Sequence, residues 1–482
     1  MQKKYKGSLA IIISGAIALA MYFINPFVLP EIPNRTIVVA VLMITLWVTQ
    51  ALPMPVVALF PLILFPLMNI ESIENTAIFY SNSVIFLFLG GFLIALAIEK
   101  WNLHRRIALN IVKITGTSGN RIILGFIIAT GLISTWLSNT ATTMMMLPIA
   151  ISVIEVLKEN DLASKDNKSM ANFSLSLMLS IALASNLAVG TIIGTPPNVA
   201  YAGYIKKQLN QDVSFIDWVY LCMPLSILLM LCLYFVMVKW LYPNHIKENT
   251  ATNHFIQTQM DSLGKISGPE KRVGIIFLLT ALLWMTKDLI NKIGFIKLDD
   301  TMIALMGGLS LFFFNTGHKE RKPLLVWGDT RNMAWGILLL FGGGIALAGA
   351  LEKAGLIQQL GQWFAGFAFN QVMLIFLVTL LSVFLSEVMS NVAQVIVFAP
   401  VVTGLAIAAG MHPFLLGIPM TLGASCASMM PMGTPPNAIA FSSGHIKLPQ
   451  MMRVGFVMNI ISVLLITLFC WLVLPYVFGI NN

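Results

Sequence analysis

Residues 138–148 of this chain read SNTATTMMMLP and residues 390–400 read SNVAQVIVFAP, two stretches in which Ser, Asn, Ala and Pro keep the same spacing. Two further pairs of blocks flank them in the same order: FLGGFLIALAIEK at 88–100 with FGGGIALAGALEK at 341–353, and GTPPN at 194–198 with GTPPN at 433–437. Three blocks repeated in one order indicate an internal duplication. The chain is therefore predicted to consist of two related halves.

The composition places both halves in a lipid bilayer. Of the 482 residues, 57% are hydrophobic and 10% are charged, with a mean hydropathy of +0.85, whereas soluble domains are about 45–50% apolar and about 25% charged. One or two apolar windows of about 20 residues would indicate an anchor. A larger number predicts an all-α polytopic membrane protein. The windows are 9–29, 37–52, 84–98, 215–240, 273–290, 335–351 and 454–478.

The basic residues predict the orientation in the membrane. With a cytoplasmic N-terminus, 22 of the 29 Lys and Arg residues fall in inside loops, as the positive-inside rule requires, so the net charge of +9 needs no nucleic-acid partner. This distribution of basic residues requires that the stretches around the two Ser-Asn tips enter the membrane and turn back without crossing it. Arg121 and Lys158 then flank the first hairpin inside, and Lys353 and His412 flank the second outside. The halves are therefore predicted to be inverted repeats.

The Ser-Asn tips place hydrogen-bonding groups between apolar flanks. In the first half, SNT at 138–140 follows Ser134 by about one helical turn. Irregular polar backbone is stable in a membrane only where protein or a water-filled cavity surrounds it. The residues between Arg121 and the tip are too few to cross the bilayer and return. We therefore expect a re-entrant helical hairpin whose tip lies in a polar cavity.

Each GTPPN block predicts a helix that is broken within the membrane. Its two prolines remove amide donors and disfavour helix at the preceding residue, while its glycine tolerates the open backbone. The break frees carbonyl oxygens, which are sodium ligands, and the amides of a new helix N-terminus, which favour anions. A single proline break is usually only a kink. Two breaks paired with two polar tips predict a site for substrate and ions.

Basic side chains are sparse around these motifs. No Lys or Arg lies within ten residues of Asn139, Thr195, Asn391 or Thr434, so an anion bound there is expected to be neutralised by bound cations. Moving a dianion inward against 100 mV is opposed by about 4.6 kcal/mol, and two sodium ions would cancel that opposition. Glu387, four residues before Asn391, is interpreted either as a functional acid or as a structural brace of the hairpin.

The motifs divide the chain into alternating parts. The parts without a tip or a break are predicted to be a packing or dimerising scaffold, and the polar stretch 243–272 is predicted to be the most flexible link. A polar insertion at 158–169 explains the shorter offset between the two GTPPN blocks. The predicted boundaries are scaffold helices 1–80; a motif-bearing part 81–214 with a hairpin at 121–157 and a break at 194–198; scaffold helices and a cytoplasmic linker 215–334; a motif-bearing part 335–450 with a hairpin at 372–408 and a break at 433–437; and a C-terminal transmembrane helix 451–482.

Three stretches together resemble the divalent anion/sodium symporter family, including its bacterial INDY-type dicarboxylate transporters: FLGGFLIALAIEKWNLHRRIAL, SNTATTMMMLP and GTPPNAIAFSSGHIK. The similarity runs nearly end to end. It implies inverted repeats with about eleven transmembrane helices, two re-entrant helical hairpins, a scaffold domain and a transport domain, in a homodimer that works by an elevator movement. It implies sodium-coupled import of C4-dicarboxylates such as succinate, malate and fumarate through the bacterial inner membrane, with no organic cofactor.

The resemblance also implies roles for individual residues. The first sodium site would use Ser134, Ser138, Asn139 and the backbone of Gly194, and the second Ser386, Asn391 and the backbone of Met389 and Gly433. Substrate contacts would come from Asn139, Thr140, Thr195, Pro196, Asn391, Val392, Thr434 and Pro435. The second tip departs from the family pattern, because it reads Ser-Asn-Val where Ser-Asn-Thr is expected. We therefore expect a site that is symmetric in backbone and asymmetric in its substrate contacts.

The same residues bear on two other functions. A sodium-independent dicarboxylate or tricarboxylate exchanger of the same fold is left open by the sequence. An intramembrane enzyme would need a nucleophile with a base, or a set of metal ligands, yet the apolar segments contain no HExxH, GxSxG or Cys-His pairing. The chain is therefore not expected to be an enzyme.

Overall fold

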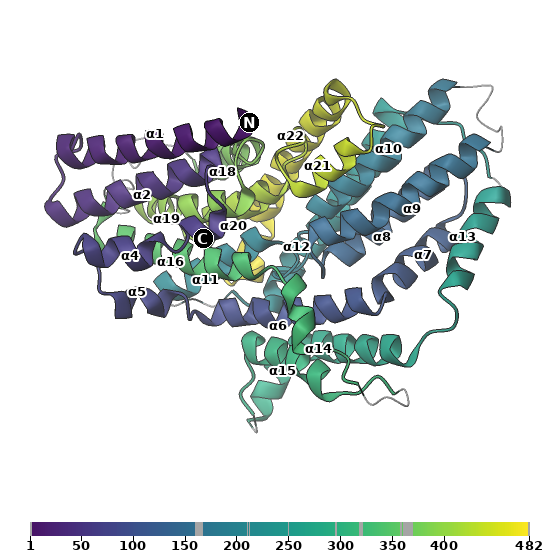
Figure 1. Ribbon diagram of the computed structural model, residues 1–482, viewed down its shortest axis with the longest axis horizontal. Coiled ribbons are helices and arrows are strands. Elements are labelled where there is room, and N and C mark those ends of the chain that lie inside the picture. The colour runs from purple at the N-terminus through teal and green to yellow at the C-terminus, as the bar shows by residue number, and fades with distance from the viewer. Residues whose placement is uncertain are drawn as a thin grey trace.

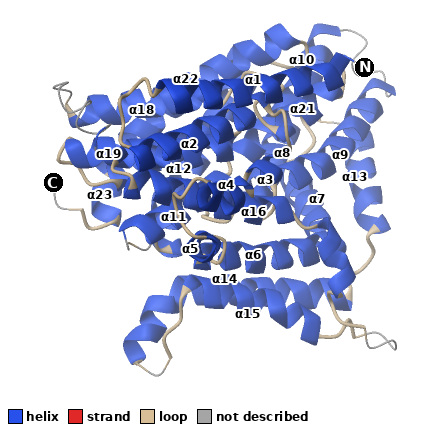
Figure 2. Cartoon of the chain, turned by 60° about the vertical axis from the view of Figure 1, so that its left-hand side comes forward, coloured by secondary structure: helices blue, strands red, loops and turns tan. Residues whose placement is uncertain are grey.

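The computed structural model describes residues 2–159, 167–209, 211, 213–248, 250–294, 296–317, 322–356, 359 and 370–480. Over these ranges the chain forms helices and no β-strand (Figure 2), which confirms the all-α prediction. Of the described helices, seven are long and apolar enough to cross a bilayer by themselves, and shorter apolar helices accompany them. The chain is therefore a multi-pass membrane protein.

The two halves repeat one order of elements. The first half contains α1 (Gln2–Ile24), α2 (Glu31–Thr49), α3 (Met54–Val57), α4 (Phe60–Leu67), α5 (Ile73–Phe79), α6 (Ser83–Lys100), α7 (Leu103–Thr115), α8 (Gly119–Ser134), α9 (Asn139–Glu159), α10 (Asn167–Asn186), α11 (Pro196–Leu209) and α12 (Phe215–Phe235), which continues as a π-helix (Val236–Leu241). The second half contains α13 (Thr250–Ser262), α14 (Gly268–Ile293), α15 (Asp300–Phe313), a 3-10 helix (Trp327–Asn332), α16 (Trp335–Lys353), α18 (Gln371–Leu385), α19 (Asn391–Ala408), α20 (Phe414–Ser425), α21 (Pro435–Ser442), α22 (Leu448–Leu472) and α23 (Leu474–Val477). A hairpin, a broken helix and a long helix thus follow one another twice, as α8–α12 and as α18–α22.

The two Ser-Asn stretches form the turns of helical hairpins. The first turn separates Ser134 at the end of α8 from Asn139 at the start of α9, and the second separates Leu385 at the end of α18 from Asn391 at the start of α19. In Figure 1, α8 and α9 extend to the right of the centre, whereas α18 and α19 extend to the left. The two hairpins therefore approach the middle of the molecule from opposite sides.

Both GTPPN blocks lie where a helix is interrupted. α10 ends at Asn186 and α11 begins at Pro196, while α20 ends at Ser425 and α21 begins at Pro435. Each unwound segment starts earlier than GTPPN alone suggests, and its prolines lie at the end of the break instead of in its middle. Proline fits the first turn of a helix, where its missing N–H is not needed. The prolines therefore start the second half-helix as well as ending the first.

The last asparagine of each GTPPN block braces its own unwound segment. Asn198 Nδ2 donates to Thr191 O at 3.0 Å, and Asn437 Nδ2 donates to Met430 O at 3.1 Å. Both carbonyls lie seven residues before the asparagine that reaches them. Since a buried carbonyl without a partner is unfavourable, this equivalent bond stabilises the same irregular turn in each half.

The paired glycines of the first repeat block allow close helix packing between the halves. A Cβ on Gly90 of α6 would overlap the backbone of Ala304 on α15, and a Cβ on Gly343 of α16 would overlap the backbone of Ala58, directly after α3. α14 and α15 form a layer beside α6 at one edge of the molecule (Figure 2). Each glycine-containing helix therefore packs on an element of the other half.

Ion pairs tie the ends of these two helices to the opposite half. Lys100 Nζ lies 2.6 Å from Asp329 Oδ2, and Lys353 Nζ lies 2.6 Å from Glu71 Oε2. Exposed pairs of this kind contribute at most about 1 kcal/mol each. These two ion pairs mainly fix the position of one half of the chain relative to the other.

The polar stretch 243–272, predicted to be the most flexible link, contains a helix. In α13 the side-chain oxygens of Gln257 and Gln259 accept hydrogen bonds from Lys113 Nζ and Arg105 Nη2 of α7, at 2.8 and 2.7 Å. These bonds hold the link against the first half. Residues 160–166 of the predicted insertion lie outside the described residues, as do two basic residues of the orientation count, at 319 and 321.

Candidate functional site

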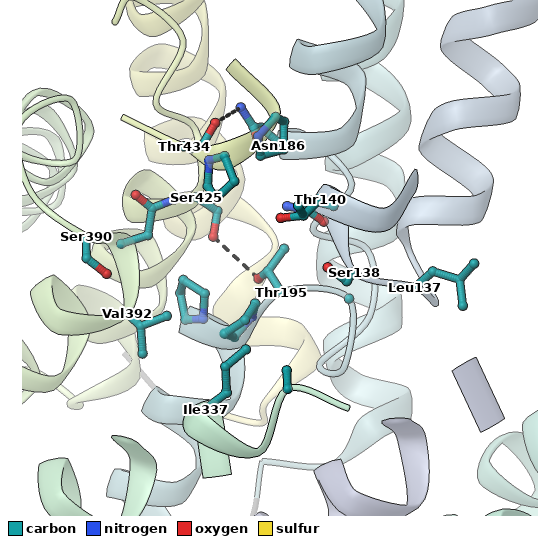
Figure 3. A pocket seen from close by; sticks show the side chains of 18 of the residues that line it. Leu137, Ser138, Thr140, Asn186, Thr195, Ile337, Ser390, Val392, Ser425 and Thr434 are labelled. Atoms are coloured by element: carbon teal, nitrogen blue, oxygen red, sulfur yellow. Dashed lines mark hydrogen bonds between the residues drawn. The ribbon is translucent and has the colours of Figure 1, made fainter. Parts of the chain in front are cut away.

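A cavity of about 500 Å³ lies where the two hairpin tips meet the two broken helices. All eight predicted substrate residues line it: Asn139, Thr140, Thr195, Pro196, Asn391, Val392, Thr434 and Pro435. Figure 3 shows Ser138 and Thr140 of the first tip on one side, Ser390 and Val392 of the second tip on the other, and Thr195 between them. Among the described residues that line the cavity, none is charged. Their substrate role stays a prediction, but the repeat correctly placed them together.

The second helix of each hairpin and the second helix of each break begin at the cavity. Their first residues, Asn139 of α9, Pro196 of α11, Asn391 of α19 and Pro435 of α21, all belong to its lining. The helix dipole places partial positive charge at each of these ends. The first amides of α9 and α19 also have no partner inside the helix, whereas α11 and α21 each begin with two prolines, which have no N–H. Four such ends around one space without a basic side chain suit an anion with two negative groups.

The first tip is held by hydrogen bonds among its predicted sodium ligands. Ser134 is fully buried, and its Oγ donates to Asn139 Oδ1 at 2.8 Å. Gly194 is tied to the same tip through Thr191, whose Oγ1 accepts from Gly194 N at 3.0 Å and donates to Thr135 O at 2.6 Å. Ser138, Asn139 and Gly194 line the cavity, whereas Ser134 lies behind it. The structure thus brings this predicted oxygen set together around one short turn.

The second tip lacks the equivalent of the Ser134–Asn139 hydrogen bond. Ser386 Oγ donates to Val383 O of its own helix at 2.7 Å, so it does not reach Asn391 Oδ1. That oxygen is buried and has no hydrogen-bond partner among the described residues. Buried polar atoms are nearly always paired, so an unpaired acceptor beside a cavity marks a place for a donor or a cation. Gly433 also lines the cavity, whereas the nearly buried Met389 does not.

Glu387 connects the second tip to the second break. Its carboxylate is 4% exposed and accepts hydrogen bonds from three successive backbone amides, Ser428 N at 2.7 Å, Met429 N at 2.9 Å and Met430 N at 2.9 Å. Asn459 Nδ2 of α22 donates to the same carboxylate at 2.7 Å. Of the two interpretations that the sequence left open, this geometry supports the structural brace. The equivalent position in the first half is Thr135, which carries no charge.

Sequence reasoning missed several polar residues of the cavity wall, among them Asn186 and Ser425. Asn186 and Ser425 are the last residues of α10 and α20, and both line the cavity. Each lies eight residues before the glycine of its GTPPN block. Only this equal spacing could have revealed them, because they differ in residue type. The apolar wall, which includes Met54, Phe88 and Ile337, carries no sequence signal that separates it from ordinary membrane helices.

The sequence matches the family model described as the sodium:sulfate symporter transmembrane region over residues 3–477. It is 36% identical over 445 residues to the sodium-dependent dicarboxylate transporter SdcS of Staphylococcus saprophyticus, a match that covers 91% of this chain and 85% of that relative. The protein of the same name from Staphylococcus aureus is 35% identical over 474 residues, covering 96% of this chain and 90% of the relative.

Two solved structures share the fold at low sequence identity. MtrF of Neisseria gonorrhoeae superposes with a TM-score of 0.55 at 11% identity, covering 83% of each chain. The YdaH transporter of Alcanivorax borkumensis superposes with a TM-score of 0.57 at 13% identity, covering 84% of this chain and 87% of that one. These two likenesses concern the fold alone. The family match extends over nearly the whole sequence, and this chain belongs to the sodium:sulfate symporter family.

Proposed function

We propose that this chain is a secondary active symporter that imports C4-dicarboxylates, such as succinate, malate and fumarate, together with sodium. The observation that carries the proposal is the convergence of four helix N-termini on one cavity without charged side chains. The names of the 35–36% identical relatives, sodium-dependent dicarboxylate transporters, support the same substrate and ion. The transported species are then the dicarboxylate and sodium, with no organic cofactor.

Charge balance explains why sodium would accompany the substrate. The helix N-termini provide partial charges of about +0.5 each, but each is balanced by a partial negative charge at the other end of its helix, so they add no net charge to the part that moves. A dianion that crosses the membrane therefore needs mobile cations to offset its charge. Sodium is a hard cation with a preference for oxygen ligands, and the two tips offer Asn139 Oδ1, the unpaired Asn391 Oδ1 and nearby hydroxyl and carbonyl oxygens. We propose one sodium site at each tip, as the resemblance implies.

The proposed movement is an elevator step in a homodimer. The parts 81–214 and 335–450, which bear the hairpins and the broken helices, would form the transport domain. The parts 1–80 and 215–334 would form the scaffold and the dimer contact, and 451–482 would be the C-terminal transmembrane helix. The N-terminus would lie in the cytoplasm, since this orientation puts most basic residues inside. In this scheme the tips, breaks and bound ions move as one unit across the plasma membrane.

The proposal is tested with purified protein in proteoliposomes. We expect uptake of labelled succinate when a sodium gradient points inward, and background uptake when external sodium is replaced by choline. Uptake that is unchanged in choline contradicts sodium coupling. Uptake that requires dicarboxylate on the inside, with or without sodium, identifies an exchanger of the same fold instead.

A further inference from the structure

The last residue before each break contacts the GTPPN threonine of the opposite half (Figure 3). Asn186, at the end of α10, donates from Nδ2 to Thr434 Oγ1 at 3.0 Å. Ser425, at the end of α20, places its Oγ 3.4 Å from Thr195 Oγ1. Asn186 and Ser425 are equivalent positions of the duplication, and so are Thr195 and Thr434. The two broken helices are therefore joined by a reciprocal pair of contacts.

These four side chains are buried in the wall of the cavity. None is more than 5% exposed, and all four line the cavity. Asn186 Nδ2 also lies 3.2 Å from Ala427 O and 3.0 Å from Asn437 Oδ1. The amide has two hydrogens, which suit its two shorter contacts, to Thr434 Oγ1 and Asn437 Oδ1. It joins the two halves at the place where the substrate is proposed to bind.

The hydrogen bond from Asn186 determines whether the Thr434 hydroxyl acts as a donor or as an acceptor toward a ligand. A threonine hydroxyl has two acceptor lone pairs and one donor hydrogen. Thr434 Oγ1 accepts from Asn186 Nδ2 at 3.0 Å and, as the N-cap of α21, from Asn437 N at 3.3 Å. Both lone pairs are then occupied, and its hydrogen is left to donate. An ionised carboxylate, which only accepts hydrogen bonds, matches such a donor.

The equivalent contact, from Ser425 of the second half to Thr195 of the first, does not fix the Thr195 hydroxyl as a donor or as an acceptor. In the Thr195–Ser425 pair either oxygen could be the donor, and 3.4 Å is long for a hydrogen bond between hydroxyl groups. The Thr195 hydroxyl can therefore either donate to a ligand or accept from it. The two threonines occupy equivalent positions, but only Thr434 is fixed as a donor.

We propose that Asn186 is a positioning residue for substrate recognition. It holds the Thr434 hydroxyl as a donor toward one carboxylate of the substrate and so favours a carboxylate over a neutral amide at that end. The Ser425–Thr195 contact makes the other end of the cavity more tolerant. This inference rests on the proposed function, because it concerns the dicarboxylate in the same cavity.

The test compares Asn186→Ala with Ser425→Ala in proteoliposomes. Succinate uptake is competed with unlabelled succinate and with succinamide, its diamide, because a monoamide could place its one carboxylate at Thr434 and its amide at the tolerant end. We expect Asn186→Ala to raise the KM for succinate about tenfold, as loss of one buried hydrogen bond predicts, and to narrow the preference for succinate over its diamide by a similar factor. Ser425→Ala is expected to change both quantities by less than about threefold. Asn110→Ala is the matched control, since Asn110 is exposed on α7 and its Nδ2 donates to Arg106 O of its own helix.

Each outcome of this test bears on the inference. A wild-type KM and a wild-type preference for succinate over succinamide in Asn186→Ala overturn it. An equal loss of affinity for succinate and for succinamide assigns Asn186 to packing and overturns it as well. If Asn186→Ala does not reach the membrane, Asn186→Ser is the second variant, which copies the residue of the second half. We expect it to narrow the preference for succinate over its diamide in the same direction. An unchanged preference contradicts the inference. Sodium-independent uptake by the wild-type protein contradicts the proposed function instead.

Discussion

The first hairpin tip is closed by its own hydrogen bonds, whereas the second is held by an acid. In the first tip Ser134 donates to Asn139 Oδ1; in the second the equivalent Ser386 bonds within its own helix, and Asn391 Oδ1 has no partner among the described residues. Glu387 instead binds three amides of the neighbouring break. The two tips therefore share a backbone arrangement but differ in their side-chain hydrogen bonds.

This difference shows what the duplication has preserved. Most features that recur are set by the backbone: the turn positions, the helix starts at proline and the close packing at glycine. Few other residues can replace proline and glycine there, because both act through their own geometry. One side-chain bond also recurs, from the asparagine that reaches back seven residues to a carbonyl of the break. The side-chain hydrogen bonds of the two tips differ, since such bonds can be exchanged for others of similar energy.

Removing the tip asparagines is expected to have the largest effect. Asn139→Ala and Asn391→Ala should both reduce succinate uptake to background, because each removes an amide donor and a cation ligand from the cavity. Their stabilities should differ, however. Asn139→Ala breaks the bond from Ser134 and should lower the free energy of unfolding by about 1 kcal/mol, whereas Asn391→Ala removes an oxygen that has no partner. Uptake and sodium-free thermal unfolding of the two variants measure this. Normal uptake by Asn139→Ala contradicts the site.

Removing Glu387 is expected to have the next largest effect, on stability. Glu387→Ala leaves three buried amides and Asn459 without their acceptor and should destabilise the protein by about 3 kcal/mol. The matched variant is Thr135→Ala in the first half. Thr135 Oγ1 donates only to Gly131 O of its own helix, so the cost should stay below about 1 kcal/mol. Thermal unfolding in detergent compares the two. Equal unfolding temperatures would show that the tips are braced alike.

Exchanging the third tip residue is expected to have the smallest effect. Val392→Thr adds a hydroxyl to the second tip, and Thr140→Val removes one from the first, both with little change in volume. Uptake should persist in Val392→Thr, and the preference among succinate, malate and tricarboxylates should shift by up to about tenfold, as one new hydrogen bond allows. Competition assays on both variants measure the shift. An unchanged profile in Val392→Thr means that the asymmetry at this position does not influence substrate choice.

The hairpin turns and most of the cavity lining could be predicted from the sequence, because the same motifs occur in both halves. The turns at 135–138 and 386–390 fall inside the hairpins predicted at 121–157 and 372–408. The eight predicted substrate residues line one cavity because they occupy equivalent positions in two halves that meet there. Polar residues within apolar flanks, and prolines within a predicted helix, were sufficient signals for this.

The parts that could not be predicted depend on contacts across the fold. The partners of Glu387 lie about 40 residues away on the second break and 72 residues away on α22, and no periodicity reveals such a distance. Asn186 and Ser425 differ in residue type, so the repeat did not single them out. The unwound segments also begin earlier than GTPPN, because the prolines belong to the following helix.

We propose that sodium and a dicarboxylate bind together in the cavity between the two tips. The direct measurement is the succinate affinity of the purified wild-type protein by calorimetric titration, with and without sodium. We expect the affinity for succinate to be about tenfold or more higher in sodium, and the affinity for sodium to be raised by the same factor in succinate, because coupling between two bound ligands is reciprocal. An affinity for succinate that is the same in sodium and in choline would contradict it.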